Sequence, residues 1–184
     1  MQGSLERVRA VIHGQLPDRP PLYDLLRNDA VLSYFAGKTL TLENREEVVY
    51  AAYEPAIDAT RPLVRLPEAE RTVTLDDGRQ QRYFRWTIWT EEKRYVDSAA
   101  YAAAKRAELD AYDPTWTAEK QAGMDATLAK IADDRRRLGE VFYFPGIPGP
   151  GLQAIYGEVG LEAFSYYLAD CPDIIVELLE RNTV

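Results

Sequence analysis

Three arginines and one aspartate are the side chains of this chain best suited to chemistry on an acidic small molecule. Asp24, Arg27 and Arg61 each lie at or just after the end of a short apolar run, and Arg65 follows closely. A carboxylate can accept hydrogen bonds or handle a proton, and guanidinium groups bind carboxylates in a bidentate geometry. The alternative role for Asp24 is a turn cap, and the alternative for the arginines is that of solvated surface charges. We predict that Asp24, Arg27 and Arg61 are the catalytic residues of one pocket.

A loop rich in glycine and proline is the second candidate. It follows the apolar run Val141 to Phe144, and its bare backbone allows a ligand to approach closely. A loop that only turns the chain between a strand and a helix is an equal alternative. The predicted substrate-binding residues are those of this loop with two tyrosines: Tyr23, Gly146, Pro148, Gly149, Gly151 and Tyr156.

These residues share a pocket only if three apolar runs are neighbouring parallel strands. The runs are Leu22 to Leu26, Ile57 to Arg61 and Val141 to Phe144, each bounded by turn residues. In a parallel α/β fold, ligands bind at the carboxyl ends of the strands. The three runs therefore have to point the same way.

Helical patterns surround these runs. Ser4 is expected to cap a first helix that stops near Gly14, and Thr41 a second that ends at Pro55. Further helices are expected over Ser98 to Ala111, over Thr117 to Leu138 and, as two segments, after Gly151. A β-hairpin within 72–95 has its turn at Asp76-Asp77-Gly78, and its second strand runs from Arg79 to Trp89. We interpret it as an insertion, because it is antiparallel.

Composition narrows the function classes. A length of 184 residues with 46% hydrophobic and 28% charged residues predicts a single globular domain over 1–184. The net charge of -8 argues against attraction to nucleic acid or an anionic membrane. No apolar run approaches the roughly 20 residues that span a bilayer. With one cysteine and no targeting pattern, a cytoplasmic protein is expected.

No metal site is expected within this sequence. His13 lies on the predicted first helix, and Cys171 precedes a helix that starts at a proline, so the two belong to different elements. A buried structural role is the better interpretation for Cys171, although a thiol at a helix N-terminus is an alternative. One histidine and one cysteine do not make a zinc site. Nucleotide-binding and serine-hydrolase motifs are absent from the sequence.

Two stretches resemble the uroporphyrinogen decarboxylase superfamily, which includes decarboxylases and corrinoid-linked methyltransferases. The first is Glu6-Arg7-Val8, then Gly14, then Pro17-Asp18-Arg19-Pro20-Pro21; the second is Gly146-Ile-Pro148, then Gly157 and Asp170-Cys-Pro172-Asp173. The resemblance implies an N-terminal helix and a (β/α)8 barrel. Such a barrel takes about 250 residues, so we expect the chain to be the N-terminal part of one.

The resemblance implies a tetrapyrrole or corrinoid-linked substrate and leaves three activities open. The first is cofactor-free decarboxylation of a tetrapyrrole. The second is methyl transfer, with zinc or a corrinoid held elsewhere in a full-length protein. Where the decarboxylases carry an arginine-rich signature, this chain has Leu25-Leu26-Arg27-Asn28-Asp29, which favours methyl transfer or an uncharacterised relative. The third is a noncatalytic half-barrel that binds a partner or oligomerises, for which a homodimer is the simplest form.

Overall fold

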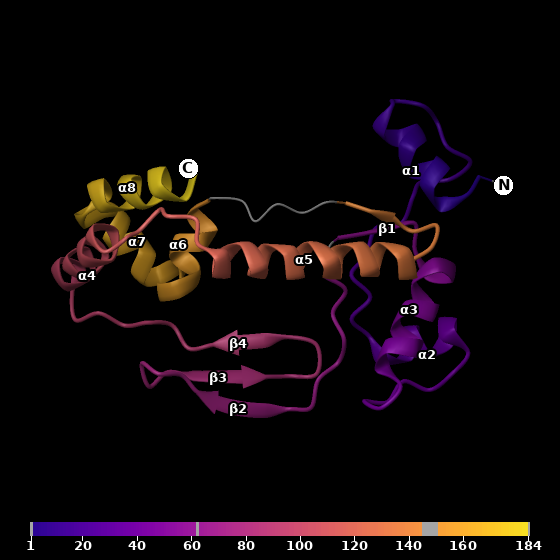
Figure 1. Cartoon of the computed structure of the whole chain (residues 1–184), viewed down its shortest axis with the longest axis horizontal. Coiled ribbons are helices and arrows are strands. Elements are labelled where there is room, and N and C mark those ends of the chain that lie inside the picture. The colour runs from indigo at the N-terminus through magenta and orange to yellow at the C-terminus, as the bar shows by residue number, and fades with distance from the viewer. Residues whose placement is uncertain (1, 62, 145–150, 184) are drawn as a thin grey trace. The chain divides into compact units, whose positions relative to one another are not determined.

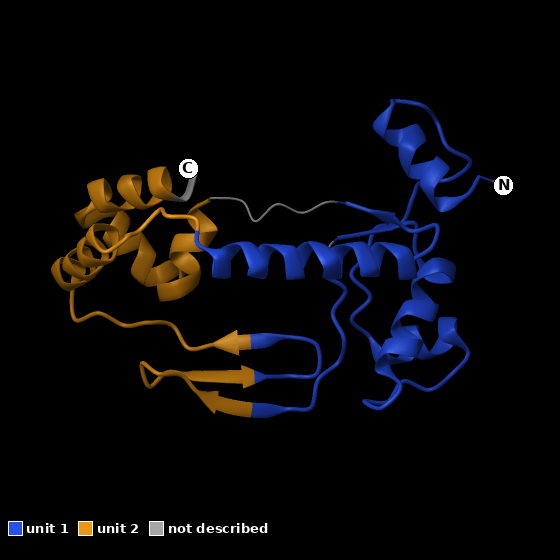
Figure 2. Ribbon diagram, in the orientation of Figure 1, with its two compact units in different colours: residues 1–71, 83–88, 117–146 blue, residues 72–82, 89–116, 147–184 orange. Residues whose placement is uncertain are grey.

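The chain is a mixed α/β protein. The computed structural model describes residues 2–61, 63–144 and 151–183. Two compact units can be distinguished (Figure 2), unit 1 with residues 1–71, 83–88 and 117–146, and unit 2 with residues 72–82, 89–116 and 147–184. The described residues form no closed barrel, so the barrel stays a prediction.

Unit 1 combines helices with a small parallel sheet (Figure 1). Its helices are α1 (Ser4–Ile12), α2 (Asp29–Ala36), α3 (Arg45–Ala56) and α5 (Ala118–Arg137), and its parallel strands are β1 (Ala59–Thr60) and β5 (Phe142–Tyr143). Its core draws five of twelve buried residues from α3, and the others come from α2 and from connecting segments. The twelve are Leu26, Leu32, Leu40, Val48, Val49, Tyr50, Ala52, Tyr53, Ile57, Val64, Leu138 and Val141.

The three predicted strands lie side by side and parallel. Ala59 pairs with Phe142 and Thr60 with Tyr143, and Tyr23 forms a parallel bridge to Ala59 on its other side. The amide of Phe142 donates to the Asp58 carbonyl oxygen at 2.8 Å. This prediction is confirmed, although the paired stretches are shorter than predicted. Leu26 has φ 42°, which turns the chain away after Tyr23.

A buried carboxylate holds the start of β1. Asp58 is completely buried and accepts hydrogen bonds from the Arg7 Nη1 and Arg19 Nη1 atoms, both at 2.5 Å. It also accepts the Ser4 hydroxyl and the Leu22 amide, both at 2.8 Å. These bonds outweigh burial and lower the pKa of Asp58 to about 2. The carboxylate thereby ties α1 and the segment before the first parallel run to β1.

Two predicted helix caps are wrong, and one helix was not predicted. Gly3 is the N-cap of α1, because the Ser4 hydroxyl is bonded to Asp58 instead. Asn44 precedes α3, and Thr41 binds Asn44 in the turn before it, where the Thr41 amide donates to Asn44 Oδ1 at 2.8 Å. The unpredicted helix is α2, capped by Asn28 and ended by a left-handed Gly37.

Unit 2 is largely helical. Its helices are α4 (Ser98–Asp110), α6 (Leu152–Val159), α7 (Leu161–Asp170) and α8 (Pro172–Thr183). The sequence predicted two helical segments after Gly151, and the structure has three, because Gly160 takes a φ of 81° between α6 and α7. Its core includes Tyr101 and Tyr167, whose rings stack with centroids 4.1 Å apart.

The predicted hairpin is part of a three-stranded sheet. The strands β2 (Arg71–Thr74), β3 (Gln80–Tyr83) and β4 (Ile88–Thr90) lie in that order, and neighbouring arrows point in opposite directions (Figure 1). The turn between β2 and β3 is where it was predicted. A continuous strand from Arg79 to Trp89 is wrong, because the Phe84 amide donates to the Thr87 carbonyl oxygen at 2.8 Å and closes a second turn.

Substituting Asp58→Asn is expected to destabilise the protein by about 3–5 kcal/mol at pH 7, since Arg7 and Arg19 would face a buried neutral partner. The folded pKa of Asp58, about 2, lies below the usual value of about 3.9. The contribution of the Asp58 carboxylate to the free energy of unfolding is therefore present above pH 4 and lost as the pH falls toward 2. Urea denaturation from pH 2 to 7 should give a flatter profile for D58N than for the wild type. Equal stability of D58N and wild type at pH 7 would contradict this role, and D76N in the exposed turn is the control.

Substituting Tyr101→Phe is expected to leave the stability unchanged or to raise it by up to about 1 kcal/mol. The Tyr101 hydroxyl is buried and has no hydrogen-bond partner among the described residues, and an unpaired buried polar group is unfavourable. Burial also raises the pKa of Tyr101, so the hydroxyl stays neutral. Thermal denaturation of Y101F beside Y166F, a change at a tyrosine that is 61% exposed, measures this. A clear loss of stability would mean that the hydroxyl has a partner.

Candidate functional site

A cavity of about 810 Å³ in unit 1 is lined by five arginines, and we call it the arginine pocket. Arg27 and Arg61 follow the first two parallel runs, and Arg45 is the first residue of α3. The remaining lining comes from the segment Leu63–Arg71, which we call the pocket loop. The residues that line the cavity are Arg27, Arg45, Arg61, Leu63, Val64, Arg65, Leu66, Glu68, Ala69 and Arg71.

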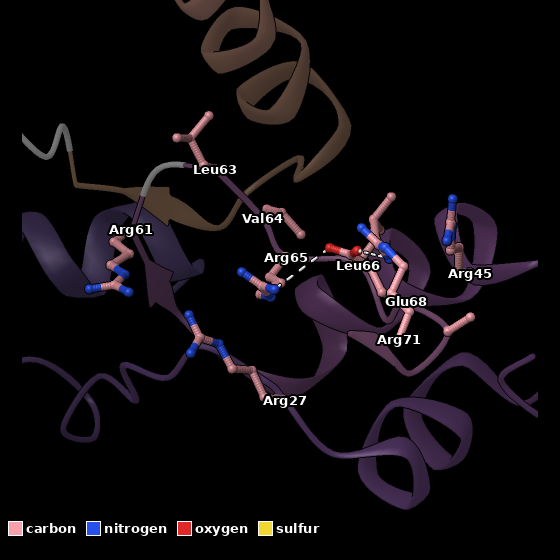
Figure 3. Close-up of a pocket in the computed structure, with 10 residues that line it drawn as sticks. Arg27, Arg45, Arg61, Leu63, Val64, Arg65, Leu66, Glu68 and Arg71 are labelled. Atoms are coloured by element: carbon pink, nitrogen blue, oxygen red, sulfur yellow. Dashed lines mark hydrogen bonds and ion pairs between the residues drawn. The ribbon is translucent and has the colours of Figure 1, made fainter. Parts of the chain in front are cut away.

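Three of these arginines converge, and only Arg65 has a carboxylate within ion-pair distance among the described residues. Figure 3 shows the guanidinium groups of Arg27, Arg61 and Arg65 turned toward a common space. The Nε and Nη2 atoms of Arg65 are buried and have no hydrogen-bond partner among the described residues, and its nearest carboxylate, Glu68, is 3.6 Å away. Arg27 and Arg61 form no ion pair in the part of the chain that is described. This group, the arginine trio, carries three positive charges beside one carboxylate, Glu68, which also pairs with Arg71.

The other two arginines are held by the protein itself. Arg71 Nη1 donates to Glu68 at 2.9 Å and its guanidinium lies over the Tyr83 ring, 3.6 Å from the centroid. Arg45 Nη1 donates to the Pro67 carbonyl oxygen at 3.1 Å. Arg45 also places a cation at the positive end of α3, which the helix dipole disfavours. Five guanidinium groups face one lining carboxylate, in a chain with a net charge of -8.

Such a cluster can attract and hold an anion. A cavity lined by one sign of charge concentrates field lines and raises the local concentration of oppositely charged ligands. Guanidinium groups form paired hydrogen bonds with carboxylates and phosphates. The cavity volume also lies within the range of about 300–1,000 Å³ that is typical of small-molecule sites. The chemistry that the pocket can supply is recognition of a small polyanion.

Asp24 and Tyr23 lie close to this pocket but do not line it. Asp24 lines a neighbouring cavity of about 310 Å³ that shares Arg27 with the arginine pocket. Its Oδ1 atom accepts the Leu26 amide at 2.7 Å, which leaves its exposed carboxylate free to meet a further group. Tyr23 is half exposed, and its ring meets Phe144 edge to face with centroids 6.0 Å apart.

The other predicted site residues divide into two groups. Gly146, Pro148 and Gly149 lie outside the described residues. Gly151 is the N-cap of α6 in unit 2, and Tyr156 lies within that helix. The Tyr156 ring packs against Phe164 with centroids 5.9 Å apart and belongs to the margin of the core of unit 2. Nothing described joins these residues to the arginine pocket.

A buried tyrosine fixes the backbone that leads to Arg27. The Tyr53 hydroxyl donates to the Leu25 carbonyl oxygen at 2.8 Å, and its side chain is almost completely buried. Burial raises the pKa of Tyr53 to about 12, so the hydroxyl remains a donor over the physiological range. Together with the bond from the Leu26 amide to Asp24, this contact sets the direction in which Arg27 leaves the sheet.

The sequence missed Arg45 and Arg71 as pocket residues. Neither follows a predicted parallel strand, and the two are separated from each other by 25 intervening residues. They reach the pocket because the pocket loop returns past the N-terminus of α3, where Pro67 meets Arg45. No local pattern in the sequence predicts that long-range contact.

The chain matches no known protein-family model, no curated protein and no solved structure. The resemblance to the uroporphyrinogen decarboxylase superfamily therefore remains a prediction. Among the described residues, no helix combines the length and apolar character required to cross a bilayer. The described part of the chain also contains no cluster of three histidine, cysteine or acidic side chains arranged to hold a metal ion.

Removing one charge of the arginine trio is expected to stabilise the protein in the absence of a ligand. Arg65→Met keeps an unbranched side chain and eliminates two buried nitrogens that have no hydrogen-bond partner among the described residues. It also breaks the 3.6 Å ion pair with Glu68, which keeps its closer pair with Arg71, so the net change should add about 1 kcal/mol to the free energy of unfolding. The gain should shrink in high salt, because salt screens the repulsion from Arg27 and Arg61. Urea denaturation at low and high salt measures both effects. R136M, at an arginine whose side chain is 77% exposed, is the control, and a loss of stability in R65M would contradict the prediction.

Proposed function

We propose that the arginine pocket binds a small molecule that carries several carboxylates. The observation that carries this proposal is the convergence of Arg27, Arg61 and Arg65, with no carboxylate of the described chain close enough to neutralise Arg27 or Arg61. Two or more carboxylates on one ligand would neutralise the trio and satisfy the buried nitrogens of Arg65. The pocket lies where the parallel strands end, the edge at which ligands bind in parallel α/β folds.

Within that class, we propose a tetrapyrrole polycarboxylate and a β/α-barrel enzyme related to the uroporphyrinogen decarboxylases. The arginines would hold the carboxylates of the substrate. Asp24 would accept hydrogen bonds from pyrrole N–H groups or carry a proton, since its cavity adjoins the pocket through Arg27. In this proposal, decarboxylation needs no cofactor, and the orientation of one carboxylate beside Asp24 decides which group is lost.

Methyl transfer on a corrinoid-linked substrate is the second candidate. It is favoured by the sequence Leu25-Leu26-Arg27-Asn28-Asp29, which stands where the decarboxylases have their arginine-rich signature. Zinc or a corrinoid would then supply the chemistry from elsewhere in a larger protein. A noncatalytic half-barrel that binds a partner remains the alternative from a different class, and a cytoplasmic location suits all three proposals.

Titration with uroporphyrin, followed by its fluorescence, tests the polycarboxylate proposal. We expect Arg61→Gln and Arg65→Gln each to weaken binding about tenfold or more, because each loses charge-assisted hydrogen bonds of about 1.5–3 kcal/mol. Coproporphyrin, which has the same macrocycle and fewer carboxylates, should bind more weakly. Added salt should weaken both complexes.

Arg136→Gln serves as the matched control, because Arg136 is a highly exposed arginine of the same unit. Cobalamin, followed by its absorption spectrum, distinguishes the second candidate. Uroporphyrin binding that is equally tight in R61Q, R65Q and wild type would refute the role of the arginine pocket. Binding of cobalamin but not of uroporphyrin would replace the first candidate by the second.

A further inference from the structure

The backbone at the start of the pocket loop is strained. Leu63 has φ 62°, in the left-handed region that residues other than glycine, asparagine and aspartate rarely adopt. Its side chain is 53% exposed, so burial of the leucine does not explain the conformation. Residues held in such conformations persist only where the surrounding structure imposes them, and they are concentrated at functional sites.

Two hydrogen bonds impose it. The Leu63 amide donates to the Tyr143 hydroxyl oxygen at 2.8 Å, and the next amide, that of Val64, donates to Asp134 Oδ2 at 3.2 Å. Tyr143 is the last residue of β5, and Asp134 comes from α5. The two acceptors therefore connect the pocket loop to the sheet and to the long helix of unit 1.

The deeper acceptor is rigidly held. The Asp134 carboxylate is completely buried and also accepts hydrogen bonds from the Tyr50 hydroxyl and the Lys130 ammonium group. Burial and the bond to Asp134 raise the pKa of Tyr50, which keeps its hydroxyl protonated as a donor. A carboxylate with three donors around it has little freedom to move.

We propose that Tyr143 and Asp134 are positioning residues of the arginine pocket: by holding Leu63 and Val64, they turn Arg61 and Arg65 toward the same space as Arg27. This inference rests on the proposed function of that pocket. Leu63 lies between Arg61 and Arg65 in sequence, so its backbone angle decides whether the two guanidinium groups converge. Neither Tyr143 nor Asp134 lines the cavity, so both act through the backbone.

Tyr143→Phe removes the acceptor for the Leu63 amide and preserves the ring. We expect uroporphyrin to bind about five- to tenfold more weakly to Y143F, because a smaller fraction of the protein would present both arginines. Amide hydrogen exchange at Leu63 and Val64 should become faster in the same variant without ligand. Y34F, at a tyrosine of unit 1 that is 79% exposed, is the control.

A glycine at position 63 distinguishes a positioning role of Tyr143 from a role in stability alone. Glycine adopts positive φ without strain, so the double variant L63G/Y143F should return to within about twofold of the wild-type affinity. A purely structural tyrosine would lower the melting temperature, leave the affinity below that temperature unchanged and show no rescue by glycine.

The outcomes distinguish this inference from the proposed function. If Y143F binds and exchanges like the wild type while R61Q and R65Q lose binding, the positioning role is wrong and the pocket stands. If the wild type binds neither uroporphyrin nor cobalamin, the proposed function fails. Amide hydrogen exchange then tests on its own whether Tyr143 fixes the pocket loop. Unchanged exchange rates at Leu63 and Val64 in Y143F would show that it does not.

Discussion

The buried carboxylate of Asp58 is the interaction on which unit 1 depends. Five hydrogen bonds from four residues reach its two oxygens: the Ser4 hydroxyl, Arg7, two from Arg19 and the Leu22 amide. All of these donors come from the first 22 residues, so the N-terminal segment is fixed to β1 through one acid. Because a buried ion that loses its partner is strongly unfavourable, the set forms as a whole or not at all. The parallel alignment of Tyr23 with Ala59 follows directly, since the Leu22 amide is one of the donors.

Arginine has two opposite roles in this unit. Arg7 and Arg19 face Asp58, and Arg7 Nε also donates to Asp18 at 2.8 Å, so their charges are neutralised at the amino ends of the parallel strands. Arg27, Arg61 and Arg65 lie beyond the carboxyl ends, where the one lining carboxylate, Glu68, pairs with Arg65 at 3.6 Å and with Arg71 at 2.9 Å. In parallel α/β folds, ligands bind at the carboxyl ends of the strands. Arginine charge is therefore neutralised by carboxylates at one end of this sheet, whereas at the other end Arg27 and Arg61 form no ion pair among the described residues.

The sequence predicted the elements that depend on local patterns. The apolar runs around Tyr23, Ala59 and Phe142 are bounded by turn residues, and their predicted parallel order is confirmed. Arg27 and Arg61 line one cavity, whereas Asp24 lines the neighbouring one. The helix α2 was predictable, since Asn28 and Gly37 are ordinary start and stop signals. The role of Ser4 was not, because its hydroxyl is taken by Asp58, 54 residues away. Arg45 and Arg71 were not predicted as pocket residues for the same reason, because a contact between distant segments, and not a local preference, brings them to the cavity.

The arginine pocket combines features that oppose folding. Three like charges converge, two buried guanidinium nitrogens of Arg65 have no hydrogen-bond partner among the described residues, and Leu63 is held in a conformation that leucine avoids. The rest of unit 1 offsets these costs through the Asp58 network, the buried face of α3 and the fixed carboxylate of Asp134. A protein gains nothing in stability from such a pocket, and local conflicts of this kind are typical of functional sites. An anion in the pocket would offset the first two conflicts, and anion binding is the function that we propose for it.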